Sequence, residues 1–172
     1  MAATLSVYLD TSALNFLFAD DAPEKKDITL DFFENFLKPG IYRPFISDFV
    51  LQEINQASSL EKRRALQDAV RDYFVELLVL DNIDEIQTLA SNYLSEGVVP
   101  PNKILDALHI ACAVDHEIDY LVSWNYKHLA NVNREKKVLA VNVANNYLKF
   151  LIFELPFRTV EHSGLRDSLV AS

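Results

Sequence analysis

Short apolar runs alternate with helical patterns along this chain, and that alternation limits its fold more than any other feature of the sequence. Strands that are separated by helices usually run parallel in one sheet, with the helices packed on its two faces. We therefore predict a three-layer α/β/α fold around a central, mainly parallel sheet of four to five strands. Pro44 indicates an edge strand or an irregularity, and the third run is expected to be largely buried. The expected strands are residues 5–9, 41–47, 75–80, 119–124 and 151–157.

Helix-start residues divide the segments between these strands. Pro23 suits the first position of a helix, and Ser47 or Asp48 can cap the helix that follows the second strand. Asn82, with Glu85 three residues later, resembles a capping pair. The expected helices are residues 14–19, 23–38, 48–58, 61–74, 82–97, 103–117, 125–131 and 134–150.

Composition is that of one globular domain. The 172 residues are half hydrophobic, so a sizeable core is expected. The single cysteine, Cys112, rules out a disulfide within this sequence, and we interpret it as a packed residue. Nothing resembles a signal peptide or a membrane span, so the expected compartment is the cytoplasm. The net charge of −9 argues against a protein that coats DNA but is compatible with a nuclease that carries a local basic patch.

Four carboxylate or amide side chains follow the expected strands or begin the expected helices. Asp10 directly follows the first strand, and Asn125 directly follows the fourth. Glu53 lies about one turn into the helix after the second strand, and Asp106 lies in the first turns of its own helix. Because ligands of open α/β sheets bind at the carboxyl ends of the strands, we expect these four positions to meet at one rim.

Such a cluster of carboxylates predicts a metal site. Converging carboxylates raise one another's pKa, and a divalent cation removes that penalty. Oxygen ligands favour Mg²⁺ or Mn²⁺, and no cluster of cysteine and histidine offers a zinc site. Taken alone, each acid has an ordinary interpretation, with Asp10 as a helix cap and Glu53 and Asp106 as solvated charges. His109 and Trp124 are more simply packed residues than a ligand and a base-stacking platform.

Four sequence blocks resemble, in the same order, the motif blocks of PIN domains. They are VYLDTSALNFLF, SDFVLQEI, ILDALHIACA and DYLVSWNYKHLAN, and together they span roughly residues 5–131. The resemblance implies a metal-dependent nuclease, mostly acting on RNA, on a Rossmann-like parallel sheet. It divides the chain into a PIN-like nuclease domain, residues 1–150, and a closing strand and weakly structured tail of the same domain, residues 151–172. Many PIN domains are toxins of bacterial toxin–antitoxin pairs.

The resemblance also implies roles at the rim. Asp10, Glu53 and Asp106 are the expected catalytic residues and the ligands of one or two Mg²⁺ or Mn²⁺ ions. Asn125 stands where the family often has an aspartate. It is expected to act at the catalytic site through its amide carbonyl, which can coordinate but brings no negative charge. Hydrolysis by a metal-activated water would leave a 5′ phosphate and a 3′ hydroxyl.

Neighbouring hydroxyl and basic residues are candidates for binding substrate. Thr11, Ser12, Ser123 and Lys127 could hold a water molecule or a phosphate oxygen. Thr11 and Ser12 could equally satisfy the backbone at the helix start. Three further basic residues also suit a solvated helix face, and two lie nearer the rim; these are Lys62, Arg63 and Arg64, and Lys103 and His128.

Two classes of function follow. The leading interpretation is a metal-dependent endoribonuclease that cuts single-stranded RNA and forms a toxin–antitoxin pair with a small antitoxin protein. The alternative is a degenerate PIN-fold module that binds protein or RNA without cleaving, which Asn125 leaves open. A phosphatase-like enzyme with Asp10 as nucleophile would need a second aspartate two residues later, where Ser12 stands. Residues 134–172 could dock a partner, bind RNA or form a homodimer.

Overall fold

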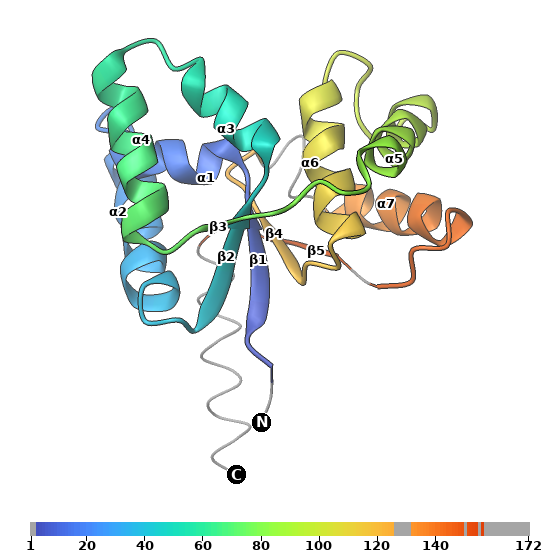
Figure 1. The fold of residues 1–172 in the computed structure, drawn as a ribbon, viewed down its shortest axis with the longest axis horizontal. Coiled ribbons are helices and arrows are strands. Elements are labelled where there is room, and N and C mark those ends of the chain that lie inside the picture. The colour runs from blue at the N-terminus through green and yellow to red at the C-terminus, as the bar shows by residue number, and fades with distance from the viewer. Residues whose placement is uncertain (1–2, 126–131, 150, 155, 157–172) are drawn as a thin grey trace.

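The computed structural model describes residues 3–125, 132–149, 151–154 and 156, and it has one five-stranded sheet at its centre (Figure 1). Every strand pairing is parallel, and the strand order is β3-β2-β1-β4-β5. The strands are β1 Leu5–Leu9, β2 Tyr42–Ile46, β3 Glu76–Leu77, β4 Tyr120–Val122 and β5 Ile152–Glu154. The predicted parallel sheet is therefore confirmed.

Helices cover both faces of the sheet, which gives the predicted three layers. Helices α1, α2 and α4 lie on one side, and α5, α6 and α7 lie on the other (Figure 1). The predicted helix 125–131 falls almost wholly outside the described residues, as do Lys127 and His128. The helices are α1 Thr11–Asn15, the 3₁₀ turn η1 Phe16–Phe18, α2 Pro23–Phe32, the π-turn η2 Phe33–Leu37, α3 Asp48–Asn55, α4 Leu60–Asp72, α5 Ile83–Ser95, α6 Ile104–Asp115 and α7 Val132–Ala144.

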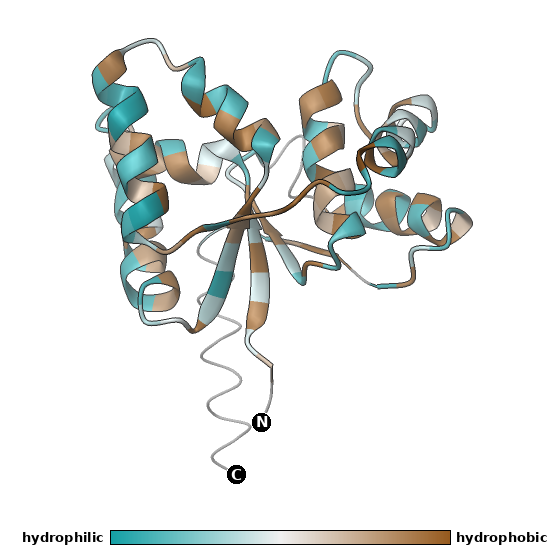
Figure 2. Ribbon diagram, viewed as in Figure 1, coloured by the Kyte–Doolittle hydropathy of each residue, from teal (hydrophilic) through white to brown (hydrophobic). Residues whose placement is uncertain are grey.

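Side-chain polarity follows this layering. Helix α4 carries mostly hydrophilic residues, whereas α6 carries broad hydrophobic bands (Figure 2). Most residues of α6 from Ala107 to Val114 are buried. Cys112 of α6 is fully buried, as predicted for a packed residue. No helix in the described part of the chain is both long enough and apolar enough to cross a membrane.

The order of the strands places a topological switch at the middle of the sheet. From β1 the chain proceeds outward to β2 and β3, and it then returns to the other side of β1 to form β4 and β5. Leu9 pairs with Val122, and the backbone N–H of Asp10 donates to the Val122 carbonyl at 3.3 Å. The residues that follow β1 and β4 therefore start side by side. In open α/β sheets, ligands bind outside the carboxyl ends of the strands at this switch.

Two strand predictions need correction. Strand β3 is a two-residue edge strand with both residues exposed, so the run 75–80 is not largely buried. Leu78 is buried, but Val79 is 69% exposed, as expected where only one face meets the core. Strand β2 lies inside the sheet, so Pro44 does not mark an edge strand. Strand β3 pairs only with the last two residues of β2, Phe45 and Ile46. Pro44 therefore lies outside that pairing, and its missing N–H removes no hydrogen bond between β2 and β3.

Two predicted helix caps use their side chains elsewhere. Ser47 precedes α3, but its hydroxyl bonds the Tyr8 hydroxyl at 2.7 Å instead of a helix N–H. Asn82 precedes α5, but its amide donates to Asp115 at 3.4 Å. Asp10 does cap α1 with its side chain. A cap residue with a buried polar neighbour can satisfy that neighbour in preference to the helix, and Ser47 does so.

Candidate active site

Asp10 lies at the carboxyl end of the middle strand and is only 4% exposed. Its Oδ1 accepts hydrogen bonds from the Ser12 hydroxyl at 2.6 Å and from the backbone N–H of Ala13 at 3.1 Å. Its Oδ2 accepts from the Ser123 hydroxyl at 2.5 Å. Asp10 is therefore a helix cap and, at the same time, a buried carboxylate held by donors that follow both β1 and β4.

The charge state of Asp10 reflects this burial. Burial raises the pKa of the Asp10 carboxyl, because the charged form loses its hydration. Hydrogen bonds from Ser12 and Ser123 lower that pKa, but burial is the largest effect and the net direction is upward. The site therefore favours a proton or a cation at this carboxylate.

Two serines tie the segment after β4 to Asp10. The Ser12 hydroxyl also accepts from the backbone N–H of Trp124 at 2.9 Å, and Ser123 Oγ accepts from the backbone N–H of Asn125 at 2.8 Å. Both hydroxyls thus orient Asp10 and fix the loop beside it. The predicted role of the Asn125 amide in catalysis stays a prediction, because its contact here is through the backbone.

Trp124 is a packed residue in this structure. Its indole N–H donates to Thr29 Oγ1 at 2.8 Å, and its ring centroid lies 5.6 Å from that of Phe16. Lys25 Nζ lies 5.5 Å from the centroid of the indole ring. These contacts anchor the start of the segment after β4 on α2 and η1.

Glu53 begins a chain of hydrogen bonds that leads into the core. Its Oε1 lies 2.6 Å from His109 Nε2, and His109 Nδ1 lies 2.7 Å from the Tyr8 hydroxyl. The Tyr8 hydroxyl lies 2.7 Å from Ser47 Oγ. Tyr8, His109 and Ser47 are all at most 3% exposed. Burial raises the pKa of the Tyr8 phenol far above its usual value, so this hydroxyl keeps its proton. The packed role predicted for His109 is confirmed, but the sequence did not reveal its partners Tyr8 and Ser47.

Asp106 lies in the first turn of α6, one turn before His109. The amino end of a helix stabilises a negative charge. Burial lowers the pKa of the Arg134 guanidinium in α7, and the negative charge of Asp106 opposes that change. Asp106 is thus electrostatically coupled to the first turn of α7.

The predicted acids do not form a closed ligand cage. Within the residues that the structure describes, no group of three or more His, Cys, Asp or Glu side chains is placed to hold a metal ion. Glu53 is bonded to His109, whereas Asp10 is bonded to Ser12 and Ser123. Asp106 shares helix α6 with His109. The assignment of all three acids as metal ligands stays a prediction.

The chemistry of these residues nevertheless fits a hard divalent cation. The donors are carboxylate oxygens, and each carboxylate has about four acceptor positions, so it can accept a cation beside its hydrogen bonds. The Thr11 hydroxyl is buried beside Asp10 in the sequence and has no hydrogen-bond partner among the described residues. A water molecule or a phosphate oxygen would satisfy it.

The basic residues that were predicted to hold substrate are spread over the fold. Lys103 directly precedes α6, three residues before Asp106. Lys62 and Arg64 are exposed on α4, whereas Arg63 is half-buried and donates to a backbone carbonyl at 3.5 Å. Substrate binding by any of them stays a prediction.

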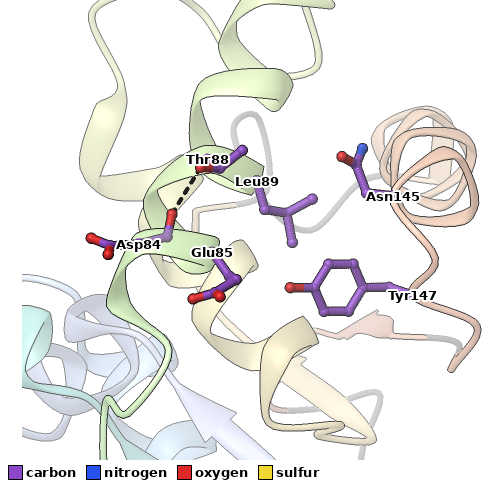
Figure 3. A pocket seen from close by; sticks show the side chains of 6 residues that line it. All are labelled: Asp84, Glu85, Thr88, Leu89, Asn145 and Tyr147. Atoms are coloured by element: carbon purple, nitrogen blue, oxygen red, sulfur yellow. Dashed lines mark hydrogen bonds between the residues drawn. The ribbon is translucent and has the colours of Figure 1, made fainter.

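A separate cavity of about 260 Å³ lies between α5 and the end of α7 (Figure 3). None of the predicted site residues lines it, and its acids lie in the first turn of α5. It is lined by Asp84, Glu85, Thr88, Leu89, Asn145 and Tyr147.

Comparison with known proteins identifies the family. The family model of the PIN domain matches residues 7–135, which is most of the chain. The chain belongs to the PIN domain family. Members of this family are generally nucleases, and the match includes Asp10, Glu53 and Asp106 of this PIN domain. None of the curated proteins matches the chain.

A solved structure has the same fold. It is the crystal structure of VapBC2 from Rickettsia felis bound to a DNA fragment from their promoter, with a TM-score of 0.53 and 15% sequence identity. The similarity covers 88% of this PIN domain chain and 98% of the other chain. It therefore covers more of the chain than the matched family segment does.

Proposed function

We propose that this PIN domain is a divalent-metal-dependent endoribonuclease that hydrolyses phosphodiester bonds of single-stranded RNA. The observation that best supports this proposal is the placement of Asp10. It is a buried carboxylate at the topological switch of a parallel sheet, and donors from the segments that follow β1 and β4 hold it in place. A carboxylate whose burial disfavours its charge is well suited to a cation.

In this proposal, Asp10, Glu53 and Asp106 hold one or two Mg²⁺ or Mn²⁺ ions. A bound divalent ion supplies Lewis-acid polarisation of the phosphodiester and lowers the pKa of a water molecule. Ser12 and Ser123 hold the Asp10 carboxylate in one orientation. The buried Thr11 hydroxyl is suited to donate to a phosphate oxygen, and the Asn125 amide would orient a neighbouring ligand.

Substrate binding has to overcome the acidic charge of the whole chain. With a net charge of −9, long-range attraction for RNA is unfavourable, so local cations must hold the phosphates. Lys103, three residues before Asp106, and Lys127, two residues after Asn125 in the sequence, are the candidates. We expect binding that weakens steeply as salt concentration rises.

We also propose a toxin role in the cytoplasm. The solved structure with the same fold is of VapBC2 bound to promoter DNA. By analogy, this chain would pair with a small antitoxin protein that blocks the predicted acids Asp10, Glu53 and Asp106, and it would form a homodimer. Co-expression with the product of a small neighbouring gene, followed by light scattering, tests both statements.

A non-cleaving PIN-fold module is the second candidate. Two observations favour it, namely Asn125 at a position that is often acidic in the family and the absence of a three-ligand metal group among the described residues. Such a module would bind RNA or a protein without hydrolysis.

The deciding experiment is cleavage of a mixed single-stranded RNA pool with Mn²⁺, with Mg²⁺ and with EDTA. We expect cutting that needs the metal and falls by about 100-fold or more in Asp10→Asn, Glu53→Gln and Asp106→Asn. Asp84→Asn and Glu85→Gln are matched controls, because they make the same changes at acids of the α5 cavity (Figure 3). Both controls should cleave like the unmodified protein.

Intact RNA in every lane, together with calorimetric Mn²⁺ binding that Asp10→Asn abolishes, would favour the non-cleaving module. An equal loss of cleavage in the control variants would instead mean that the cleavage does not depend specifically on Asp10, Glu53 and Asp106.

A further inference from the structure

The hydrogen bond between Glu53 and His109 has a defined direction. An ionised Glu53 carboxylate can only accept, so His109 Nε2 must donate to it across the 2.6 Å contact. His109 Nδ1 and the Tyr8 hydroxyl share the next hydrogen bond, at 2.7 Å. The Tyr8 hydroxyl also shares a hydrogen bond with Ser47 Oγ, at 2.7 Å. The side-chain polar atoms of the three buried residues, Tyr8, Ser47 and His109, are therefore all paired, as buried polar groups usually are.

The two ends of this chain differ in their exposure. His109 is 3% exposed, whereas the Glu53 side chain is 28% exposed. The anchor is thus fixed in the core, and the carboxylate reaches toward solvent. Glu53 Oε2 accepts no hydrogen bond from the described residues, so it is the oxygen that an incoming ligand meets.

Anchoring changes what a glutamate can do. A glutamate on a helix has three rotatable bonds and loses that freedom when it binds a cation. A glutamate that is already held by a buried donor has lost most of this freedom on folding, so binding costs less. Buried partners that orient ligands typically change metal affinity by about 10–100-fold.

We propose that His109 is a positioning residue for Glu53. It holds the Glu53 carboxylate from the core, with Tyr8 and Ser47 behind it, so that Oε2 can bind the cation. This inference rests on the proposed function, because it assigns Glu53 to a divalent cation. It adds a residue that contacts neither metal nor RNA and acts through Glu53 alone.

Two substitutions distinguish the positioning of Glu53 by His109 from the mere filling of space by the imidazole ring. In His109→Gln, the side-chain amide can reach the place of Nε2 and donate to Glu53. In His109→Asn, the shorter amide can reach the place of Nδ1 and Tyr8 but cannot reach Glu53. Both replacements are neutral, polar and smaller than histidine. His116→Asn is the matched control, because His116 ends the same helix and bonds the backbone carbonyls of Cys112 and Val79.

The primary measurement is the Mn²⁺ affinity of the RNA-free protein, read as free Mn²⁺ by electron paramagnetic resonance. We expect His109→Asn to bind about 10–100-fold more weakly than the unmodified protein, and His109→Gln to recover most of that loss. His116→Asn should bind normally. Adding His109→Asn to Glu53→Gln should cause no further loss, because His109 acts only through Glu53.

Three results would overturn the inference. The first is unchanged affinity in His109→Asn. The second is a further loss of affinity when His109→Asn is combined with Glu53→Gln. The third is an equal loss in His109→Asn and His109→Gln accompanied by equal loss of stability in urea, which would mean a purely structural role.

A proton NMR measurement separates this inference from the proposed function. An imidazole N–H resonance protected from exchange should be present in the unmodified protein and lost in Glu53→Ala. If the unmodified protein neither binds Mn²⁺ nor cleaves RNA, the proposed function fails, and the metal role of His109 fails with it. If the unmodified protein does both and only the His109 predictions fail, the function stands and this inference alone is refuted.

Discussion

Asp10→Asn should make the protein inactive and, at neutral pH, more stable. Burial raises the pKa of Asp10, so the folded state disfavours the charge that the unfolded chain carries without penalty. Asparagine removes that charge and keeps the cap, since its side-chain oxygen can accept from Ala13 and Ser12. The Ser123 hydroxyl loses an acceptor at Asp10 Oδ2, but Ser12 Oγ lies 3.3 Å away and can replace it.

The size of the effect follows from linkage. Below the pKa of an unfolded aspartate, about 4, both states are protonated and the charge costs nothing. As pH rises, the unfolded chain ionises first and the folded protein keeps its proton, so stability falls until pH passes the raised folded pKa of Asp10. Each unit between the two pKa values costs about 1.4 kcal/mol. Between pH 4 and neutrality, the free energy of unfolding of Asp10→Asn relative to the unmodified protein should rise by about 1.4 kcal/mol for each unit by which the folded pKa of Asp10 exceeds the unfolded one.

Urea unfolding in EDTA, from pH 4 to pH 8, measures this difference. Asp10→Ala is the companion variant, because it also removes the charge but loses the cap, which costs about 0.5–2 kcal/mol. Added Mn²⁺ at 100 times its dissociation constant should stabilise the unmodified protein by about 2.7 kcal/mol and should not stabilise Asp10→Asn. A difference between Asp10→Asn and the unmodified protein that stays constant with pH, or shrinks as pH rises, would refute the reasoning.

Two further substitutions test the buried hydrogen bonds around the site. Tyr8→Phe removes a buried hydroxyl that bonds both His109 and Ser47, so the free energy of unfolding in urea should fall by about 1–3 kcal/mol. An unchanged value would mean that these bonds do not form. Thr29→Val removes the acceptor of the Trp124 indole N–H, which should cost about 1–3 kcal/mol and shift the fluorescence of the single tryptophan. An unshifted spectrum would contradict that contact.

The strands and helices were predictable because their signals are local. Apolar runs and helical spacing can be recognised within ten to fifteen residues, and a parallel sheet follows from their alternation. The exposure of β3 was not predictable in the same way. The run VELLVL is apolar enough for an interior strand, and only the order of the strands, which depends on contacts across the whole chain, places it at the edge.

The placement of Asp10 could also be predicted from the sequence. An acid directly after a strand lies at the carboxyl edge of a parallel sheet, whatever the position of that strand in the strand order. Its partners were partly local, because Ser12 is two residues away, but Ser123 is 113 residues away. The pairing of Ser123 with Asp10 depends on β4 lying next to β1, which the alternation of strands and helices does not specify.

The series of hydrogen bonds that joins Ser47, Tyr8, His109 and Glu53 is the part of the site that was hardest to predict from the sequence. Tyr8 and His109 are 101 residues apart, and each one, taken alone, reads as a core residue. There was nevertheless a usable signal, because a histidine on the apolar face of a helix and a tyrosine in a buried strand both carry polar atoms that must find partners in the core. Tyr8 precedes Asp10 by two residues, and His109 follows Asp106 by three. Polar core residues so close in sequence to two predicted ligands are expected to pair with each other beneath the site. This expectation follows from the need of buried polar atoms for partners, and the order of the motif blocks alone does not provide it.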